Sequence, residues 1–400
     1  MTEPPVYVPR SGPSWRDPWP MYAALRERDP VHHVVPAGNP DADYWVLSRH
    51  ADVFEAARDV ETFSSAQGLT TEYDELDRIG LRDNPPFVML DPPSHTDFRR
   101  TVSRGFTPRQ VASVEPVVRA YVGERLDRVA EAGEVDIVAE LFKPLPTMVV
   151  AHYLGVPAED RDRFDRWTHD IVAASSAGHP LEAAEAVTEL MTYFTELAER
   201  RRREPDDDTI SHLVAAGMAD DMPGLLSILG FAFTMVTGGN DTTTGMLGGA
   251  VQLLSGRPDQ RELLTADLDL VPDAVEELLR LTSPVQGLCR TTTCDVEIDG
   301  TTIPAGRKVL LLYGSANRDP LKYGPDAEEL DVTRGPSQIL TFSHGNHHCL
   351  GAAAARMQAR VALEELLTRF PRFEVDLGGV EHAPGPYVRR PTRVPFRAGA

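Results

Sequence analysis

The sequence predicts a mainly helical protein with a minor share of β-structure. Helix-like segments cover most of the chain, and the strand-like runs between them are short. The longest helical segment, residues 223–256, carries Asp241 as its only charge, which indicates a helix in the core of a large protein. No Gly/Ser-rich linker, low-complexity run or internal repeat divides the 400 residues, so we expect a single domain over residues 1–400.

The individual elements are predicted from their local patterns. Helices are expected at 19–26, 50–58, 111–132, 146–153, 160–174, 181–203, 209–216, 223–256, 273–280 and 350–370. Strands are expected at 31–35, 44–47, 288–293, 296–298 and 309–312, with a late, proline-containing edge hairpin at 387–396. Residues 67–93 form a long segment with scattered Asp, Asn, Gly and Pro, which is typical of a functional or mobile loop.

Composition and charge exclude several classes of function. The formal net charge of −21 argues against nucleic acid as a general partner. Only three cysteines are present, so no disulfide framework is indicated. The chain starts with a polar, proline-rich arm without an apolar signal region, and we expect neither secretion nor an N-terminal membrane anchor. A cytoplasmic protein is the expectation.

A lone cysteine, Cys349, ends a glycine-containing loop directly before the helix predicted at 350–370. Free backbone N–H groups and the positive end of the helix dipole favour an anion there, so we expect a lowered thiol pKa and a thiolate. Gly345 can take a positive φ, and small residues such as Gly351 follow the cysteine. This pattern suits a flat metal macrocycle that lies against the loop.

The cysteine allows three other interpretations. A lone Cys is most often a small buried apolar residue. A zinc site is disfavoured because His347, His348 and Cys349 are too close together for typical ligand spacing. Covalent haem attachment requires Cys-x-x-Cys-His, and that order is absent from the sequence.

The full spacing around the cysteine resembles the haem-binding signature of the cytochrome P450 family. Where the family usually has Gly six residues before the Cys, this chain has Ser343. The resemblance implies a helical triangular prism with small sheets, and haem b (iron protoporphyrin IX) between the long central helix and the Cys-bearing helix. The positions that match the signature are Phe342, Gly345, His347, Cys349 and Gly351.

The central helix contains a second informative stretch, Gly238-Gly239-Asn240-Asp241-Thr242. Two adjacent glycines inside a helix cost roughly 1 kcal/mol each relative to Ala, and they leave a thin place where a group can lie against the backbone. The Thr242 hydroxyl can bond the Gly238 carbonyl. A membrane span would fit the length of 223–256, but its eight glycines make a poor lipid-facing surface. The stretch is similar to the oxygen-activation motif of the same family, which implies a proton relay of Asp241 and Thr242.

Two further pairs match the family, although each alone is an ordinary helical spacing. His95 and Arg99, four residues apart, correspond to haem propionate ligands, and Arg290 resembles the other propionate contact. Glu277 and Arg280 form a Glu-x-x-Arg pair, and by the resemblance Arg334 joins them in a structural ion cluster that serves folding and haem retention.

The resemblance implies a haem-thiolate monooxygenase that inserts one oxygen atom from O2 into a lipophilic small molecule, with electrons from NAD(P)H through a reductase and a ferredoxin. Pocket walls are expected at 67–88, 164–184, 233–243 and 284–288. A haem-thiolate sensor without turnover and a peroxide-driven hydroxylase are the alternatives. The presence of both Asp241 and Thr242 disfavours each of them.

A local basic patch is expected on this acidic chain. The resemblance places its two segments on the Cys side of the haem, where they would steer an acidic ferredoxin. The patch consists of Arg99, Arg100, Arg104, Arg109, Arg356 and Arg360.

Overall fold

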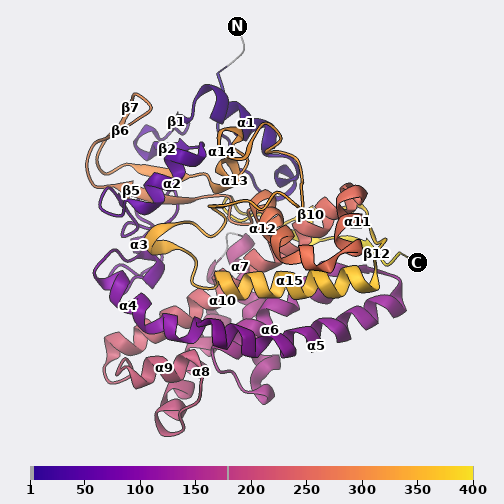
Figure 1. Ribbon diagram of the computed structural model, residues 1–400. Helices are drawn as coiled ribbons and strands as arrows, with labels where there is room; N and C mark the ends of the chain where they lie inside the picture. The colour runs from indigo at the N-terminus through magenta and orange to yellow at the C-terminus, as the bar shows by residue number, and fades with distance from the viewer. Residues whose placement is uncertain (1–3, 178–179, 400) are drawn as a thin grey trace.

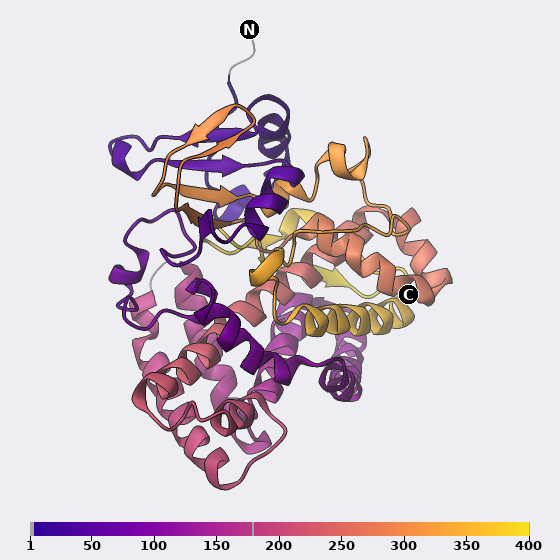
Figure 2. The ribbon, with the colours of Figure 1, turned by 60° about the vertical axis from the view of Figure 1, so that its left-hand side comes forward.

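A computed structural model of the protein describes residues 4–177 and 180–399. Helices form most of it, and the larger strands gather in one corner (Figures 1 and 2). The helices are α1 (Trp19–Arg28), α2 (His50–Arg58), α3 (Glu75–Arg78), α4 (Ser94–Val102), α5 (Pro108–Ala132), α6 (Pro144–Tyr153), α7 (Arg161–Ala177), α8 (Ala184–Arg203), α9 (Thr209–Ala215), α10 (Met222–Gly256), α11 (Pro258–Ala266), α12 (Val271–Thr282), α13 (Tyr313–Ala316), α14 (Pro320–Tyr323) and α15 (Ala352–Arg369).

The strands form four small sheets. The largest has the order β1-β2-β8-β5-β3, in which only β2 and β8 run parallel, so the N-terminal strands are joined to a segment from the last third of the chain. The strands are β1 (Val31–Val34), β2 (Tyr44–Leu47), β3 (Phe63–Ser64), β4 (Glu134–Asp136), β5 (Leu288–Thr292), β6 (Val296–Ile298), β7 (Thr301–Ile303), β8 (Lys308–Leu311), β9 (Glu374–Val375), β10 (Glu381–His382), β11 (Pro391–Arg393) and β12 (Pro395–Arg397).

Most predicted elements are confirmed to within a few residues, and a mainly helical protein with minor β-structure is observed. The helix after Cys349 begins at Ala352 because Gly351 is its N-cap residue. The prediction missed several strands of two or three residues, such as β3 and β9. Runs this short carry no readable alternation of apolar and polar residues.

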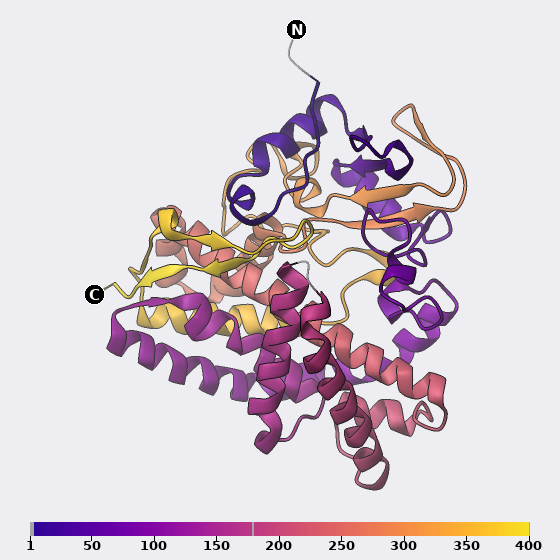
Figure 3. The same cartoon turned by 180° about the vertical axis from the view of Figure 1, so that it is seen from behind.

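The hairpin predicted at 387–396 is wrong, because its two strands belong to different sheets. β11 pairs with β10, whereas β12 pairs with β4 and β9. Between them, Val394 donates its N–H to Asp136 (2.9 Å) and accepts the N–H of Ile137 (3.1 Å), which directs the chain from one sheet into the next. Figure 3 shows these C-terminal strands, in yellow, beside the helical part of the molecule.

The central helix α10 runs through the protein and packs on α6, α7, α12 and α15. Residues 243–251 of this helix are all buried. Small residues permit this packing: a Cβ at Gly245 would lie 3.0 Å from the carbonyl oxygen of Arg389, and one at Gly248 would collide with Pro391. Among the described residues, α10 is the one helix long and apolar enough to cross a membrane, a test that core helices also pass.

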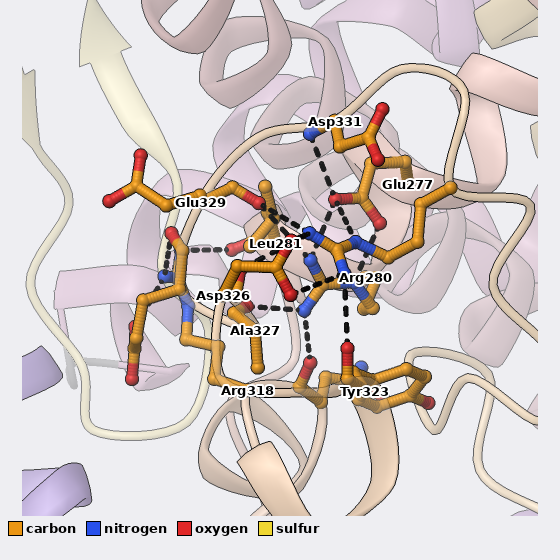
Figure 4. Close-up of polar contacts among 12 residues, drawn as sticks. Glu277, Arg280, Leu281, Arg318, Tyr323, Asp326, Ala327, Glu329 and Asp331 are labelled. Atoms are coloured by element: carbon orange, nitrogen blue, oxygen red, sulfur yellow. Dashed lines mark hydrogen bonds and ion pairs between the residues drawn. The ribbon is translucent and has the colours of Figure 1, made fainter.

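A buried ion cluster joins α12 to the segment before the cysteine loop (Figure 4). Glu277 and Arg280 are fully buried and 2.7 Å apart, and Arg334 Nε lies 3.2 Å from Glu277 Oε1. Arg280 also donates to the carbonyl oxygens of Asn317 (2.7 Å) and Ala327 (2.6 Å). The ion cluster expected from the sequence is therefore confirmed, and it fixes the chain that leads into the cysteine loop.

Candidate functional site

The cysteine loop is held in shape by its own backbone and by α2. Cys349 donates its N–H to the carbonyl of Phe342 (2.9 Å), which closes the loop. Gly345 has φ +68°, and a Cβ there would come within 3.0 Å of the Ala57 carbonyl oxygen at the end of α2. The positive φ is confirmed, and the close approach that needs glycine is to α2.

Ser343, the position that departs from the usual glycine, has φ +57°. This is the left-handed region, which a residue with a Cβ seldom adopts. Its side chain accepts a hydrogen bond from the Tyr313 hydroxyl at 3.2 Å. The turn is therefore kept, and the Tyr313 contact gives serine a partner that glycine would lack.

The thiol of Cys349 does not have the predicted lowered pKa. Its side chain has accessible surface but sits deep among protein atoms, and burial raises the pKa of the Cys349 thiol. A backbone hydrogen bond from Gly351 and the charges of Arg99 and Arg356 lower the pKa in part. Desolvation of the thiolate outweighs these three contributions, and a bound metal ion would favour the thiolate.

Four basic side chains gather beside this loop: His95, Arg99, Arg290 and His347. The imidazole centroids of His95 and His347 are 4.2 Å apart. Burial, together with the nearby charges of Arg290, His95 and Arg99, lowers the pKa of His347 to about 3. Arg290 is 3% exposed and donates to the carbonyl of Cys289 (2.8 Å).

This basic cluster fits a dianionic cofactor. His95 is buried, and neither of its ring nitrogens has a hydrogen-bond partner among the described residues. Buried polar atoms are normally satisfied, so the two nitrogens indicate an acceptor that the polypeptide does not supply. The carboxylates of haem b meet this need in charge and in hydrogen bonding.

Sequence reasoning missed one residue of the cluster. Ser65, next to the edge strand β3, lies with its Oγ 3.2 Å from His347 Nε2, and its N–H donates to Asp91 (2.9 Å). Its position became evident only from the pairing of β3 with β5, which carries Arg290.

On α10, the stretch around Asp241 and Thr242 is helical throughout. Thr242 donates its hydroxyl hydrogen to the Gly238 carbonyl at 2.9 Å, as predicted. A Cβ at Gly238 would meet no atom within 4 Å, whereas one at Gly239 would lie 2.9 Å from Val150 Cγ2. Gly238 thus leaves open space beside the helix, and Gly239 allows α6 to approach.

Asp241 has a partner that the sequence did not reveal. Arg390, in the C-terminal segment just before β11, lies with Nε 2.8 Å from Asp241 Oδ2. A single acid in an apolar helix predicts a nearby cation, because an unpaired buried charge is costly. The sequence gives no sign of which arginine provides it.

The expected basic patch is smaller than predicted. Arg356 contacts Glu276 through two hydrogen bonds of 2.5 and 2.9 Å. Arg360 pairs with Glu115 (2.5 Å) and Glu364 (3.1 Å). These carboxylates neutralise both arginines, so neither provides a free positive charge for docking.

The remaining arginines of the patch lie at and after α4. Arg104 and Arg109 are exposed, and Arg100 pairs with Asp97 at 3.1 Å.

Of the predicted pocket walls, residues 178 and 179 lie outside the described residues.

Comparison with known proteins identifies the family. A model of the Cytochrome P450 family matches residues 251–385. Cytochrome P450 130 of Mycobacterium tuberculosis is 68% identical over 387 residues, which cover 96% of each chain. Vitamin D(3) 25-hydroxylase of Pseudonocardia autotrophica is 37% identical over 393 residues, covering 97% of this chain and 96% of the relative.

A solved structure agrees in fold. The P450 CYP109E1 of Bacillus megaterium, in complex with testosterone, superposes with a TM-score of 0.83 at 30% identity and covers 96% of this chain and 100% of its own. The arrangement of helices and small sheets is therefore the P450 fold. On these relationships the chain belongs to the cytochrome P450 family, whose members are haem b-dependent monooxygenases.

Proposed function

We propose that Cys349 is the axial ligand of the haem iron and that the haem lies between α10 and the Cys349 loop. The observation that carries this proposal is the basic cluster beside the loop, where buried His95 has two unsatisfied ring nitrogens. His95, Arg99 and Arg290 would hold the propionates. Phe342, Gly345, His347 and Gly351 would complete the loop that faces the haem, with Gly238 and Gly239 on the opposite side.

When bound, the haem supplies the activation of O2 and the oxygen-insertion chemistry. The polypeptide supplies protons and excludes water. Asp241 would pass protons from the side of Arg390 toward the Thr242 hydroxyl, which lies one residue further along the helix. Because Thr242 is anchored on the Gly238 carbonyl, its oxygen keeps a fixed position beside the open space at Gly238.

The substrate is proposed to be a lipophilic small molecule. Phe233, Met235 and Val236 in segment 233–243 and Pro284, Val285 and Leu288 in segment 284–288 offer apolar side chains. Two of the relatives named above are a vitamin D(3) 25-hydroxylase and a P450 with bound testosterone. Electrons are proposed to come from NAD(P)H through a reductase and a ferredoxin. We also propose that residues 1–400 form one domain and that the protein is cytoplasmic.

Turnover assays test this function. The haem-loaded protein would be supplied with either a ferredoxin and its reductase or hydrogen peroxide alone, with a ligand chosen from binding spectra against a lipophilic library. Product from the ferredoxin system is expected, with little from peroxide. Product from peroxide alone would identify a peroxide-driven hydroxylase, and tight ligand binding without product under both conditions would indicate a sensor.

The relay is tested by Thr242→Ala. We expect haem and ligand binding to persist while reducing equivalents are diverted to hydrogen peroxide, and Asp241→Asn should slow turnover with a raised solvent isotope effect. Ser227→Ala is the matched control, because Ser227 makes the same kind of bond to the Pro223 carbonyl (2.9 Å) in the first turns of α10, outside the expected pocket wall. Normal coupling in Thr242→Ala would remove the relay from the proposal.

A further inference from the structure

A cavity lies at the C-terminal end of α10, apart from the proposed haem site. It measures about 220 Å³ and shares no lining residue with the Cys349 loop, the basic cluster or the Asp241–Arg390 pair. Its walls come from α1, the last two turns of α10, the end of α12 and the C-terminal segment. The polar and aromatic residues that line it are Trp19, Gln252, Arg257, Thr282, Arg318 and Arg389.

Three guanidinium groups line this cavity, and two of them have carboxylate partners. Arg257 pairs with Asp259 (2.8 Å) and Glu329 (3.2 Å). Arg318 pairs with Glu328 at 2.8 Å. Their charges are thereby compensated within the protein.

Arg389 differs from the other two. Its Nε donates to the carbonyl of Trp15 (2.8 Å), and no ion pair to a carboxylate is found for it among the described residues. Its guanidinium carbon lies 5.2 Å from the ring centroid of Trp19, and that of Arg318 lies 3.6 Å from the same ring. Two guanidinium groups therefore share one aromatic ring at the cavity wall, and one of them, Arg389, has no ion pair with a carboxylate among the described residues, although Asp17 lies near enough to favour its charge.

The protein around Arg389 and Arg318 disfavours their positive charges. Burial lowers the pKa of Arg318 and of Arg389 to about 10. The charge of Arg318 contributes to the shift of Arg389, and the charges of Arg280 and Arg26 contribute to the shift of Arg318. Arg318 Nε is fully buried and has no hydrogen-bond partner among the described residues. A buried excess of positive charge, together with an N–H donor that has no acceptor, favours a bound anion. The anion would supply both the negative charge and the hydrogen-bond acceptor.

We propose that this cavity binds a small oxyanion, a phosphate or carboxylate group, through Arg389 and Arg318. Guanidinium groups recognise both kinds of oxyanion by paired N–H···O bonds. The cavity is large enough for the charged group together with a short organic part. Because it shares no residue with the haem site, its ligand is an effector or a structural anion and not the molecule that is oxidised.

The test is a calorimetric titration of the haem-loaded protein with inorganic phosphate and, in a second arm, with acetate, at constant ionic strength in chloride. We expect saturable 1:1 binding of at least one anion. The anion with the higher affinity, phosphate or acetate, identifies the kind of oxyanion that the cavity binds. The absence of saturable binding in both arms would overturn the proposal.

Variants locate the site. Arg389→Gln should weaken binding at least tenfold, whereas Arg393→Gln, which removes the same charge from an exposed position at the end of β11, should leave it unchanged. Gln252→Glu introduces a carboxylate into the cavity wall, so it should abolish anion binding and raise the thermal midpoint. This variant decides the question if Arg389→Gln does not fold. An equal loss of anion affinity in Arg389→Gln and Arg393→Gln would show that the anion is attracted to the surface charge in general, which contradicts a specific site. Unchanged anion binding in Gln252→Glu would contradict the site as well.

Discussion

Arg390 and Asp241 form a largely buried ion pair that joins the C-terminal segment to the central helix α10. The Nε–Oδ2 distance is 2.8 Å, and the two side chains are 10% and 18% exposed. Lys143 lies near this ion pair. Burial and the charge of Arg390 lower the pKa of Lys143, whereas the charge of Asp241 raises it. Lys143 Nζ lies 2.6 Å from Nδ1 of His169, an exposed residue of α7.

Arg390→Gln is expected to lower the turnover rate about tenfold, because it frees Asp241 from its fixed position without removing the carboxylate. The fraction of NAD(P)H electrons recovered in product should fall, and the solvent isotope effect on turnover should rise. Haem content and KM should change little. Arg393→Gln is the control, and an unchanged isotope effect in Arg390→Gln would show that the pair serves stability alone.

Cys349→Ala is expected to abolish the strongly red-shifted Soret band that thiolate ligation gives the reduced, CO-bound protein. The other two cysteines are Cys289, which is buried, and Cys294, which is exposed. Cys294→Ala should retain the band in full and serves as the control. The ligand assignment fails if the same band persists in Cys349→Ala.

Glu277→Gln is expected to destabilise the protein by about 3–5 kcal/mol, because it leaves buried Arg280 without its charge partner. The free energy of unfolding and the yield of haem-containing protein measure the effect. Glu381→Gln is the control, since Glu381 lies 3.9 Å from Arg393 at an exposed site. Loss of the Glu381 charge should lower the free energy of unfolding by less than about 1 kcal/mol. Similar losses in both variants would count against a special role for the buried cluster.

A pH dependence is expected from His382. Burial, aided by the charges of Arg389 and Arg16, lowers its pKa from the ordinary value of 6.5 to about 4. Below pH 6.5 the His382 side chain binds a proton in the unfolded chain but stays neutral in the folded protein. The free energy of unfolding therefore decreases as the pH falls from about 6.5 to 4.

In His382→Gln this contribution disappears, and the unfolding free energy should fall less steeply over that window, by the equivalent of one proton. Denaturant unfolding at several pH values measures the slope. Equal slopes in parent and variant would show that His382 is protonated in the folded state.

Arg104→Glu is expected to slow electron transfer from the ferredoxin and to weaken its dependence on salt. Arg104 is exposed and follows α4, whose Arg99 acts on the Cys349 thiol, so this segment borders the cysteine. Arg393→Glu carries the same change of charge elsewhere on the surface and should have no effect. Stopped-flow reduction at low ionic strength gives the rates, and equal rates would place docking on another surface.

The sequence by itself determined the elements whose pattern is local. The spacing from Phe342 to Gly351 identified the cysteine loop, and the uncharged run around Asp241 identified the central helix. Both depend on residues close in the chain, since helical periodicity, glycine conformations and the fit of a loop to a flat cofactor are properties of a short segment. The Glu277–Arg280 contact follows from the same i, i+3 geometry.

Only the tertiary structure decided which distant groups meet. It paired Asp241 with Arg390, neutralised Arg356 with Glu276, and divided segment 387–396 between two sheets. It also placed Cys349 deep among protein atoms, where burial raises the thiol pKa against the helix end. Such partners are fixed by the packing of helices and sheets far apart in sequence. The energy of a charge depends on that packing because burial removes water and brings remote counter-charges within a few ångströms.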